Sequence, residues 1–583
     1  GLAAALIERP GDALVLEVDE LTVPHVAPIV APQAMVVTGL FRDQLDRYGE
    51  VAKVRAVLQQ AATAMPETTL VLNGDDPLTA SLEAKRRLIF RLAHAPLEMP
   101  ADGTDCPRCG ALLQYSARYY AQLGEYRCPA CGFAAPEADI AAAVSADGFV
   151  VNGKTLPPLP QALHPYSALA GIAAVRALGL ETWPTAWPPP VEGRGSSATI
   201  EGRQVTVVLG KNPAAVSWNL AQHQGDVHLF LVNNRTADGR DVSWLWDINL
   251  APVRCAAVSG ERGREMLIRL RYEPQVKKAR LYEQPAGAFA AALAATPEGG
   301  RLVVVATYTA LKAAVGLLRR PPPAHATARA KPSAARGTRL PDRPRRHIGS
   351  QQIRIAVLFP DQLGTYADSG NALVLQRRLE WRGIGASVAR IGPGDRLPGD
   401  CDVLLFGGGE DRGQALALEA LRAMRADLKA MLADGVPALL VCGGYQLYGE
   451  SLPLEGREVG GLGLMPFTTR RGSPRLVGPI GVASALVPES LIGFENHGGH
   501  SALLAGGAAL GRVLWGHGNG PKGSEQEGLV LGHTIGTYLH GPILARNPAL
   551  AEVMLGWVAE RRGFGPLAPL DDAIEHRAAL KRA

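Results

Sequence analysis

The stretch LVCGGYQLYG, residues 440–449, places a cysteine between a short apolar run and two glycines. The preceding run, VPALLV, is typical of a strand that is buried on both faces of a parallel sheet. The two glycines permit a tight turn, and the residues after them can begin a helix. A strand, a sharp turn and a helix in this order expose the turn residue above the sheet. Cys442 is therefore predicted to be a nucleophile, the alternative being an inert cysteine in the core.

Other segments with the same pattern surround this cysteine. IRIAVLFP (353–360) and CDVLLFGGGEDRG (401–413) each indicate a buried strand, and IGTYLHGP (535–542) places His540 after a short β-type run. Strands that alternate with helices and end in glycine turns predict an open α/β sheet with its site at the carboxyl ends of the strands. A histidine at that edge can take up the proton of the cysteine thiol, which is the arrangement for thiolate catalysis.

The bulk composition is that of a multidomain globular protein. The chain has 583 residues, 47% of them hydrophobic and 20% charged. No apolar run reaches the roughly 18 residues that a membrane-spanning helix needs, so no transmembrane segment is expected. Seven cysteines, four of them in two CxxC pairs, favour a reducing cytoplasm over a disulfide framework.

One tract differs from the rest in composition. Residues 319–347 are rich in Pro, Ala and Arg and hold eight Arg and one Lys against one Asp, so the formal net charge of +5 is concentrated there. Without apolar periodicity such a tract cannot bury a core, and it is predicted to be a flexible linker. A solvated tether is favoured over an RNA- or membrane-binding arm, and no nucleic-acid partner is expected.

The cysteine pairs CPRC (106–109) and CPAC (128–131) have the spacing of a zinc site. Four thiolates on two turns can hold one ion in a tetrahedron, and no open ligand position is evident. Cys106, Cys109, Cys128 and Cys131 are therefore predicted to bind a structural zinc, with disulfides as the alternative.

Carboxylates in the N-terminal part suggest a second metal. GDALVLEVDELTVP (11–24) is predicted to be a strand ending in Glu17, Asp19 and Glu20. Carboxylates at the carboxyl end of a strand suit a Mg²⁺ that also touches nucleotide phosphates. TTLVLNGDDP (68–77) has a similar form.

The cysteine and histidine motifs resemble those of class I glutamine amidotransferases. The resemblance implies an oxyanion hole formed by Gly408, Gly409 and the N–H of Gly443. Members of this group commonly carry a Glu two residues after the His, whereas this chain has His540-Gly541-Pro542. The cobyric-acid-synthase-like branch shares that feature.

Within that branch, TYADSGN (365–371), GFENHGGH (493–500) and GTYLHGP resemble the GatD subunit of the lipid II isoglutaminyl synthases. The resemblance implies that an arginine between the Cys and the His holds the substrate glutamine. Arg475 matches best, with Arg470 and Arg471 as alternatives and a solvated loop arginine as the competing interpretation.

The N-terminal part resembles MurT, the partner subunit in that family. The resemblance rests on VVTGLFRDQLDRYGE (36–50), the four-cysteine motif, KNP (211–213) and DGRDVSWLWD (238–247). It implies ATP and Mg²⁺ as cofactors, bound with the participation of Glu17, Asp19, Asn73 and Asp75. It also implies that an Asp of the MurT-like half completes the glutaminase site across an interface, with Asp241 favoured and Asp247 as the alternative.

The fold class expected from these matches is multidomain α/β. Residues 1–190 are expected to form a Mur ligase central-like domain with a zinc ribbon at about 104–134, and residues 191–318 a MurT C-terminal α/β domain. Residues 319–350 form the linker, and residues 351–583 a flavodoxin-like glutamine amidotransferase domain. We call residues 1–318 the N-terminal half and residues 351–583 the C-terminal half.

A Walker A loop should precede a Mur central domain, and none is found where the chain begins. GFVVNGKT (148–155) matches the pattern, but Asn-Gly between short β-type runs predicts a hairpin turn. The chain is therefore expected either to be a fragment or to obtain the loop from another chain.

The resemblance implies a fused lipid II isoglutaminyl synthase that works in the cytoplasm at the inner face of the plasma membrane. Ammonia from glutamine would amidate the D-glutamate α-carboxyl of the lipid II stem peptide, and the two halves would contact each other. The alternatives are another cobyric-acid-synthase-like ATP-dependent amidotransferase and a glutaminase or scaffold that lacks its own ATP site.

Overall fold

The computed structural model describes residues 14–42, 50–96, 104–145, 148–189, 191–322, 352–520 and 525–580. Most of the predicted linker therefore lies outside the described residues. Within them the chain forms four main sheets and a separate two-stranded hairpin.

The first sheet lies in the N-terminal half and has the order β1-β2-β3-β6-β7-β8. Its first four strands are parallel, and the last two form antiparallel pairs. The strands are β1 (Ala34–Val37), β2 (Thr69–Asn73), β3 (Arg87–Ala93), β6 (Ile140–Ser145), β7 (Gly148–Val151) and β8 (Lys154–Leu156).

Helices cover both faces of this sheet because the side chains of its central strands alternate between two cores. Leu70 and Leu72 of β2 pack in the core that contains α4, whereas Val71 packs in the core that contains α6. The helices are α2 (Val23–Val30), α4 (Val51–Ala64), α5 (Pro77–Ala80) and α6 (Pro165–Ala177), and the hairpin of β4 (Gln114–Tyr120) and β5 (Leu123–Arg127) carries the cysteine turns.

The second sheet completes the N-terminal half, with the order β13-β12-β11-β14-β10-β9. All its strands are parallel except the edge strand β9. Its elements are β9 (Ser196–Ile200), β10 (Arg203–Leu209), α7 (Pro213–Gln222), β11 (Val227–Leu231), the 3-10 helix η1 (Ser243–Asp247), β12 (Cys255–Ser259), α8 (Gly263–Arg271), β13 (Lys278–Leu281), α9 (Pro285–Ala295), β14 (Arg301–Ala306) and α10 (Tyr308–Arg319).

The third sheet is the core of the C-terminal half. Its parallel strands lie in the order β16-β15-β17-β18-β26, followed by the antiparallel edge strand β25, and this is the flavodoxin-like arrangement that was predicted. The strands are β15 (Gln352–Leu358), β16 (Gly385–Ile391), β17 (Val403–Phe406), β18 (Ala438–Val441), β25 (Leu529–Leu531) and β26 (Thr534–Thr537). The helices are α11 (Gly370–Glu380), α12 (Asp411–Ala433), α13 (Gly443–Tyr448), α14 (Ile543–Arg546), α15 (Pro548–Arg561) and α16 (Ala573–Leu580).

A fourth sheet is inserted between β18 and β26. It consists of β19 (Ser451–Leu454), β20 (Arg457–Gly460), β21 (Phe467–Ala483), β22 (Leu491–Leu503), β23 (Gly511–Trp515) and β24 (Gln526–Glu527). The long antiparallel pair β21 and β22 shifts register between Arg471 and Leu476. Such an irregularity can redirect a side chain, and Arg475 lies within it.

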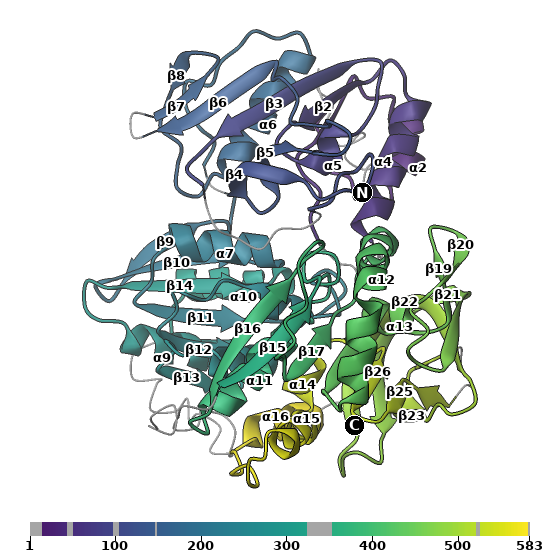
Figure 1. The fold of residues 1–583 in the computed structure, drawn as a ribbon. Helices are drawn as coiled ribbons and strands as arrows, with labels where there is room; N and C mark the ends of the chain where they lie inside the picture. Colours follow the sequence, from purple (N-terminus) through teal and green to yellow (C-terminus); the bar gives the residue numbers. More distant parts are fainter. Residues whose placement is uncertain are drawn as a thin grey trace.

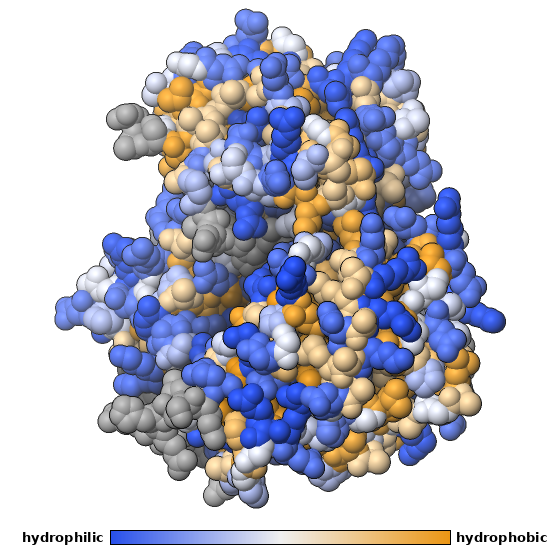
Figure 2. Space-filling model, viewed as in Figure 1, coloured by the Kyte–Doolittle hydropathy of each residue, from blue (hydrophilic) through white to orange (hydrophobic). Residues whose placement is uncertain are grey.

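One apolar core contains buried residues of both halves. Figure 1 shows how the sheets around it are arranged. The body of the first sheet lies above, and the second and third sheets lie side by side beneath it. Tyr272 of the N-terminal half packs between Trp246 of the same half and Trp381 of the C-terminal half, with ring centroids 5.3 and 5.1 Å apart and the rings tilted. On the face in Figure 2 the molecule narrows between the upper body and the lower two.

Two expectations about the N-terminal half can be compared directly with the structure. The strand expected at 11–24 is wrong for the described residues, because residues 14–19 form no regular element and a helix begins at Val23. Pro24 in the first turn favours helix initiation and removes a strand donor. The hairpin expected in place of a Walker loop is confirmed: β7 and β8 pair antiparallel around Asn152 and Gly153, both of which have positive φ.

Among the described residues, no helix combines the length and the apolar character that crossing a membrane requires.

Buried ion pairs fix the carboxyl end of the chain on the third sheet. The side chain of Arg378 on α11 is fully buried and bonds Glu552 on α15 and Asp572 before α16, at 2.6–2.8 Å. Removing one partner of such a network leaves the others buried and uncompensated, which is costly.

We predict that Arg378→Leu lowers the free energy of unfolding of the C-terminal half by about 3–5 kcal/mol. Arg354→Leu is the matched control, since Arg354 pairs with Asp400 at the surface, and it should cost under about 1 kcal/mol. Hydrogen exchange of the β15 amides in increasing urea measures both. Equal effects of the two substitutions would contradict the prediction.

Candidate functional site

Cys442 lies at the sharp turn between β18 and α13, as predicted. Its backbone has φ 49° and ψ −107°, a conformation that non-glycine residues rarely adopt. The hydrogen bond from its N–H to Thr537 O joins the turn to the end of β26. The side chain is thereby held at the carboxyl edge of the sheet, next to the segment that leads to His540.

His540 is fully buried and lies against Cys442. It is fixed by two backbone hydrogen bonds with Phe494 of β22. The proximity of the two side chains is visible at Gly408, where a Cβ would stand 2.7 Å from His540 Cε1 and 3.1 Å from Cys442 Cβ. Only glycine therefore fits between the cysteine and the histidine.

The carboxylate that orients His540 is Asp368, in the loop after β15. Asp368 Oδ2 accepts a hydrogen bond from His540 Nδ1 at 3.0 Å and another from the Gly408 N–H at 2.9 Å. With Nδ1 engaged, Nε2 is the nitrogen available to exchange a proton with the Cys442 thiol. Burial by itself lowers the pKa of His540, but the interactions with Asp368 and Cys442 outweigh it and raise the pKa to about 10.

The expectation that Asp241 reaches His540 is wrong in this structure. The carboxylate of Asp241 accepts hydrogen bonds from the N–H and the hydroxyl of Ser243 and lies 4.0 Å from Arg546. Arg546 packs against Gly541, so Asp241 contacts the histidine loop only through that arginine. The physical reason is that Asp368 from the same half already occupies Nδ1.

Asp247 lies in a different position, next to an arginine of the N-terminal half. It pairs with Arg42 at 3.0 Å, and Arg42 donates to the carbonyls of Gly364 and Thr365 in the loop that carries Asp368. Trp246 packs against Gly370 at the end of the same loop. The 241–247 segment therefore supports the Asp368 loop from the N-terminal half.

The three glycines expected as an oxyanion hole are not equivalent. The N–H of Gly408 donates to Asp368, which removes it as a donor to substrate. Gly443 is the first residue of α13, where a backbone N–H has no acceptor within the helix. The backbone N–H groups of Gly409 and Gly443 thus remain as candidate donors.

Arg475 lines the same cavity as Cys442, together with Tyr366, Gln446 and Asn496. Its Nε donates to Asn496 Oδ1 at 2.7 Å, and Nη2 is 3.3 Å from the hydroxyl of Tyr366. The ring of Tyr366 lies 4.4 Å from that of His540, so this tyrosine spans the distance from the histidine to the arginine. Of the two alternatives, Arg471 reaches the cavity while mostly exposed, and Arg470 does not line it.

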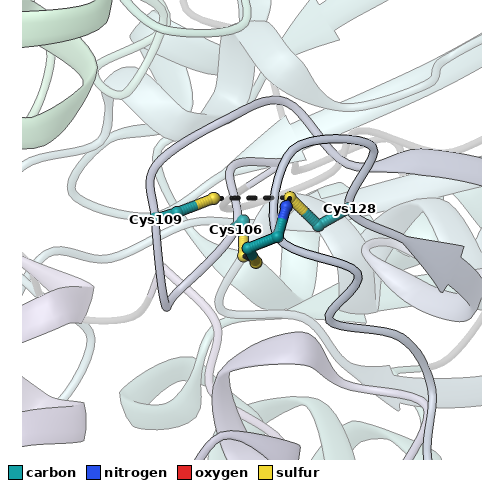
Figure 3. A group of neighbouring side chains, drawn as sticks. Cys106, Cys109 and Cys128 are labelled. Atoms are coloured by element: carbon teal, nitrogen blue, oxygen red, sulfur yellow. Dashed lines mark hydrogen bonds between the residues drawn. The ribbon is translucent and has the colours of Figure 1, made fainter.

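The four predicted cysteines lie close together. Figure 3 shows three of them, Cys106, Cys109 and Cys128. The four sulfurs all lie within 4.8 Å of one another, with 3.6 Å between Cys106 and Cys131 and 3.4 Å between Cys109 and Cys128. Zn–S bonds of about 2.3 Å in a tetrahedron put sulfurs about 3.8 Å apart, whereas a disulfide needs about 2.05 Å. The donor set fits a zinc ion, and the cysteines are free thiols here.

The residues expected to bind nucleotide and Mg²⁺ do not form such a site. Asn73 is the last residue of β2 and Asp75 follows the strand, and both are fully buried. Asp75 accepts hydrogen bonds from Arg91, the N–H of Leu92 and the hydroxyl of Tyr166, and burial raises the pKa of Asp75 to about 6. Asn73 bonds Thr38 O and the N–H of Asp75.

The other two expected ligands lie in the irregular segment before α2. Glu17 is exposed, and Asp19 accepts a hydrogen bond from the N–H of Leu21 in a turn. The prediction that Asn73 and Asp75 bind nucleotide or Mg²⁺ is therefore wrong, because their side-chain oxygens already accept hydrogen bonds within the protein.

Two family models of known proteins match separate parts of the chain. Residues 354–548 match the family model of the CobB/CobQ-like glutamine amidotransferase domain, and residues 209–311 match that of the MurT ligase C-terminal domain.

Two curated relatives correspond to the two halves. The subunit GatD of lipid II isoglutaminyl synthase (glutamine-hydrolyzing) from Staphylococcus aureus (strain N315) is 37% identical over 232 residues, which are 40% of this chain and 93% of that protein. The subunit MurT of the same enzyme from Streptococcus pneumoniae (strain ATCC BAA-255 / R6) is 30% identical over 260 residues, or 41% of this chain. The chain spans 58% of the length of that MurT relative.

Among solved structures, a pseudomurein peptide ligase type C from Methanothermus fervidus is similar with a TM-score of 0.42. The sequences are 18% identical, and the match covers 51% of this chain and 65% of that one.

We predict that Asp368→Asn slows alkylation of Cys442 by iodoacetamide at neutral pH by about tenfold or more, the equivalent of one pKa unit. Losing the carboxylate lowers the pKa of His540, so the imidazolium that stabilises the thiolate is less populated. Asp241→Asn is the control and should leave the rate nearly unchanged. Mass spectrometry of the Cys442 peptide measures the rate, and the opposite ranking of the two variants would restore Asp241 as the partner of the histidine.

Proposed function

The chain belongs to the family of the GatD subunit of lipid II isoglutaminyl synthase, and we propose that it hydrolyses glutamine at Cys442 and supplies the ammonia to its own MurT-like half. The observation that carries the proposal is the strained cysteine turn beside a histidine that a buried aspartate orients.

The proposed hydrolysis follows from the positions of the side chains. The thiolate of Cys442 attacks the carboxamide carbon, and the oxyanion that forms accepts hydrogen bonds from the N–H groups of Gly409 and Gly443. His540 gives its proton to the leaving nitrogen as the C–N bond breaks, which leaves a thioester and ammonia. Water, deprotonated by His540, then attacks the thioester and releases glutamate and the thiol.

Arg475 is the proposed ligand of the glutamine α-carboxylate. Tyr366 and Asn496 hold its guanidinium in place, and a fixed guanidinium suits bidentate binding of a carboxylate.

For the N-terminal half we propose the family reaction, the ATP-dependent amidation of the D-glutamate α-carboxyl of the lipid II stem peptide to D-isoglutamine at the cytoplasmic face of the membrane. The support is the MurT relative and the MurT C-terminal family match. Because the side chains of Asn73 and Asp75 are hydrogen-bonded within the protein, we assign no residue of this chain a role in binding ATP or Mg²⁺. The cobyric-acid-synthase alternative is less well supported, because the MurT match concerns the half in which the two enzymes would differ.

We propose that the four cysteines bind a structural zinc, which would join the two turns of the ribbon. This ribbon touches the C-terminal half: Arg412 at the start of α12 donates to Pro107 O at 3.0 Å and lies 3.7 Å from Asp105. The metal site therefore supports a contact between the halves as well as the ribbon fold.

The test of the function measures glutamate release from glutamine by the purified protein. Cys442→Ala should abolish it, while Cys401→Ala, a buried cysteine on the edge of the core, should retain it. With ATP, lipid II and glutamine labelled at the amide nitrogen, the label should appear in the stem peptide. Normal glutamate release by the Cys442→Ala protein would refute the proposal.

The zinc prediction has a separate readout. The purified protein should contain stoichiometric zinc, and Cys106→Ser should lose it. Because a structural zinc site contributes to folding, the domain that contains the first sheet should also unfold at a lower urea concentration in this variant. Cys255→Ser, outside the cluster, should keep the metal. Atomic emission measures the zinc, and a metal-free wild-type protein with the four cysteines paired as disulfides would contradict the assignment.

A further inference from the structure

The cavity that contains Cys442 and Arg475 is lined by residues from both halves. Among the residues that the structure describes, the lining comes from the C-terminal half except for Glu50, the residue immediately before α4. A carboxylate of the N-terminal half is thus part of the proposed glutamine pocket.

Glu50 lies directly beside the proposed carboxylate ligand. Its Oε1 is 3.3 Å from Arg475 Nη1, and the two side chains are 22% and 33% exposed. Arg475 is already held from its other side by Asn496 and Tyr366. Positive and negative charge therefore stand next to each other on one wall of the cavity.

The position of Glu50 is set by the loop that follows the oxyanion glycines. Glu410, two residues after Gly408, accepts a hydrogen bond at 2.7 Å from the backbone N–H of Val51, the first residue of α4. The C-terminal half thus supplies the cap of a helix in the N-terminal half. Because Glu50 is the residue before Val51, this cap holds its backbone at the mouth of the cavity.

Glu50 and Asp411 bring negative charge to a cavity that Arg471 and Arg475 also line. Asp411 also lines the cavity, and burial together with the charge of Asp411 raises the pKa of Glu50. An ammonium group placed there would compensate the negative charge of carboxylates that are only partly exposed to water.

A free amino acid carries adjacent ammonium and carboxylate groups on one carbon. Glu50 and Arg475 are neighbouring groups of opposite charge, 3.3 Å apart, so each can face one of the two charges of a free amino acid. We propose that Glu50 binds the α-ammonium of glutamine while Arg475 binds its α-carboxylate, so that the N-terminal half completes substrate recognition in the glutaminase site. This inference rests on the proposed glutaminase function.

If Glu50 binds the α-ammonium, the protein should prefer glutamine over an analogue that lacks the amino group. A buried group that is built to pair with a substrate charge is left uncompensated by an analogue that lacks it, and such analogues are strongly rejected. Glutaramate has the carboxamide and the carboxylate of glutamine but no amino group. Glutaramate should therefore bind weakly to the protein that has Glu50. Removing the charge of Glu50 should not weaken glutaramate binding further.

The experiment measures binding by calorimetry in the Cys442→Ala protein, where no hydrolysis occurs. Glu50→Gln should weaken L-glutamine binding by about tenfold to 100-fold and leave glutaramate binding unchanged, because one hydrogen-bonded charge is lost. Glu50→Asp should recover part of the affinity for glutamine. Glu67→Gln, an exposed carboxylate of the same half that pairs with Lys85, is the control and should change neither ligand.

Each outcome of the binding experiment either supports or overturns the role of Glu50. An equal loss for both ligands, or tighter glutamine binding by Glu50→Gln, would show that Glu50 shapes the pocket or competes for Arg475, and either result overturns the proposal. A wild-type protein that binds glutamine with the predicted preference but does not hydrolyse it would refute the glutaminase function and leave the recognition by Glu50 standing. Thermal unfolding of each variant confirms that the fold is retained.

Discussion

The carboxylate of Glu410 accepts a hydrogen bond from the backbone of Val51, and the relation between the two halves depends on this contact. Glu410 follows the glycines that approach Cys442 and His540, and Val51 opens the helix that follows Glu50. Burial raises the pKa of Glu410 to about 7, with the charge of Glu50 adding to the effect and the N–H of Val51 opposing it. A carboxylate buried at this cost is tolerated because it satisfies helix donors that would otherwise be unpaired.

Further contacts converge on the same region. Arg42 of the N-terminal half holds the carbonyls of the loop that carries Tyr366 and Asp368, and Asp247 holds Arg42. Arg412 binds the cysteine ribbon through Pro107. The loops after β15 and β17 form the catalytic edge of the C-terminal half, and both are in contact with the N-terminal half.

Some of this site could be predicted from the sequence. Short local sequence patterns identify Cys442 and the four cysteines of the predicted zinc site. His540 is identified by its place directly after a predicted strand. Spacing along the sequence is sufficient to propose these residues. Asp368 was not predicted, although TYADSGN was recognised as a family motif, because 172 positions separate it from His540 and no local pattern connects the two. The missing Glu after His540 suggested a partner from the other half, whereas a loop at the same edge of the sheet supplies it. That edge was predicted, and an acidic residue in its first loop was the available signal.

The nucleotide residues show a different limit. Asn73 and Asp75 have the polar character and the place after a strand that a ligand would have, but the sequence does not show that Arg91 and Tyr166 converge on Asp75. Tertiary contacts decide whether a carboxylate can bind a ligand or is already hydrogen-bonded to other residues of the protein. The same holds for Glu50, because the next residue, Val51, is capped by Glu410, which lies 359 positions from Val51 in the sequence.

The central claim is that the glutamine pocket is built by both halves. A crystal structure of the Cys442→Ala protein with bound L-glutamine tests it most directly. The account predicts the carboxamide beside residue 442, the α-carboxylate on Arg475 and the α-ammonium within hydrogen-bonding distance of Glu50. Glutamine bound with its ammonium on groups of the C-terminal half alone, and Glu50 turned away, would contradict it.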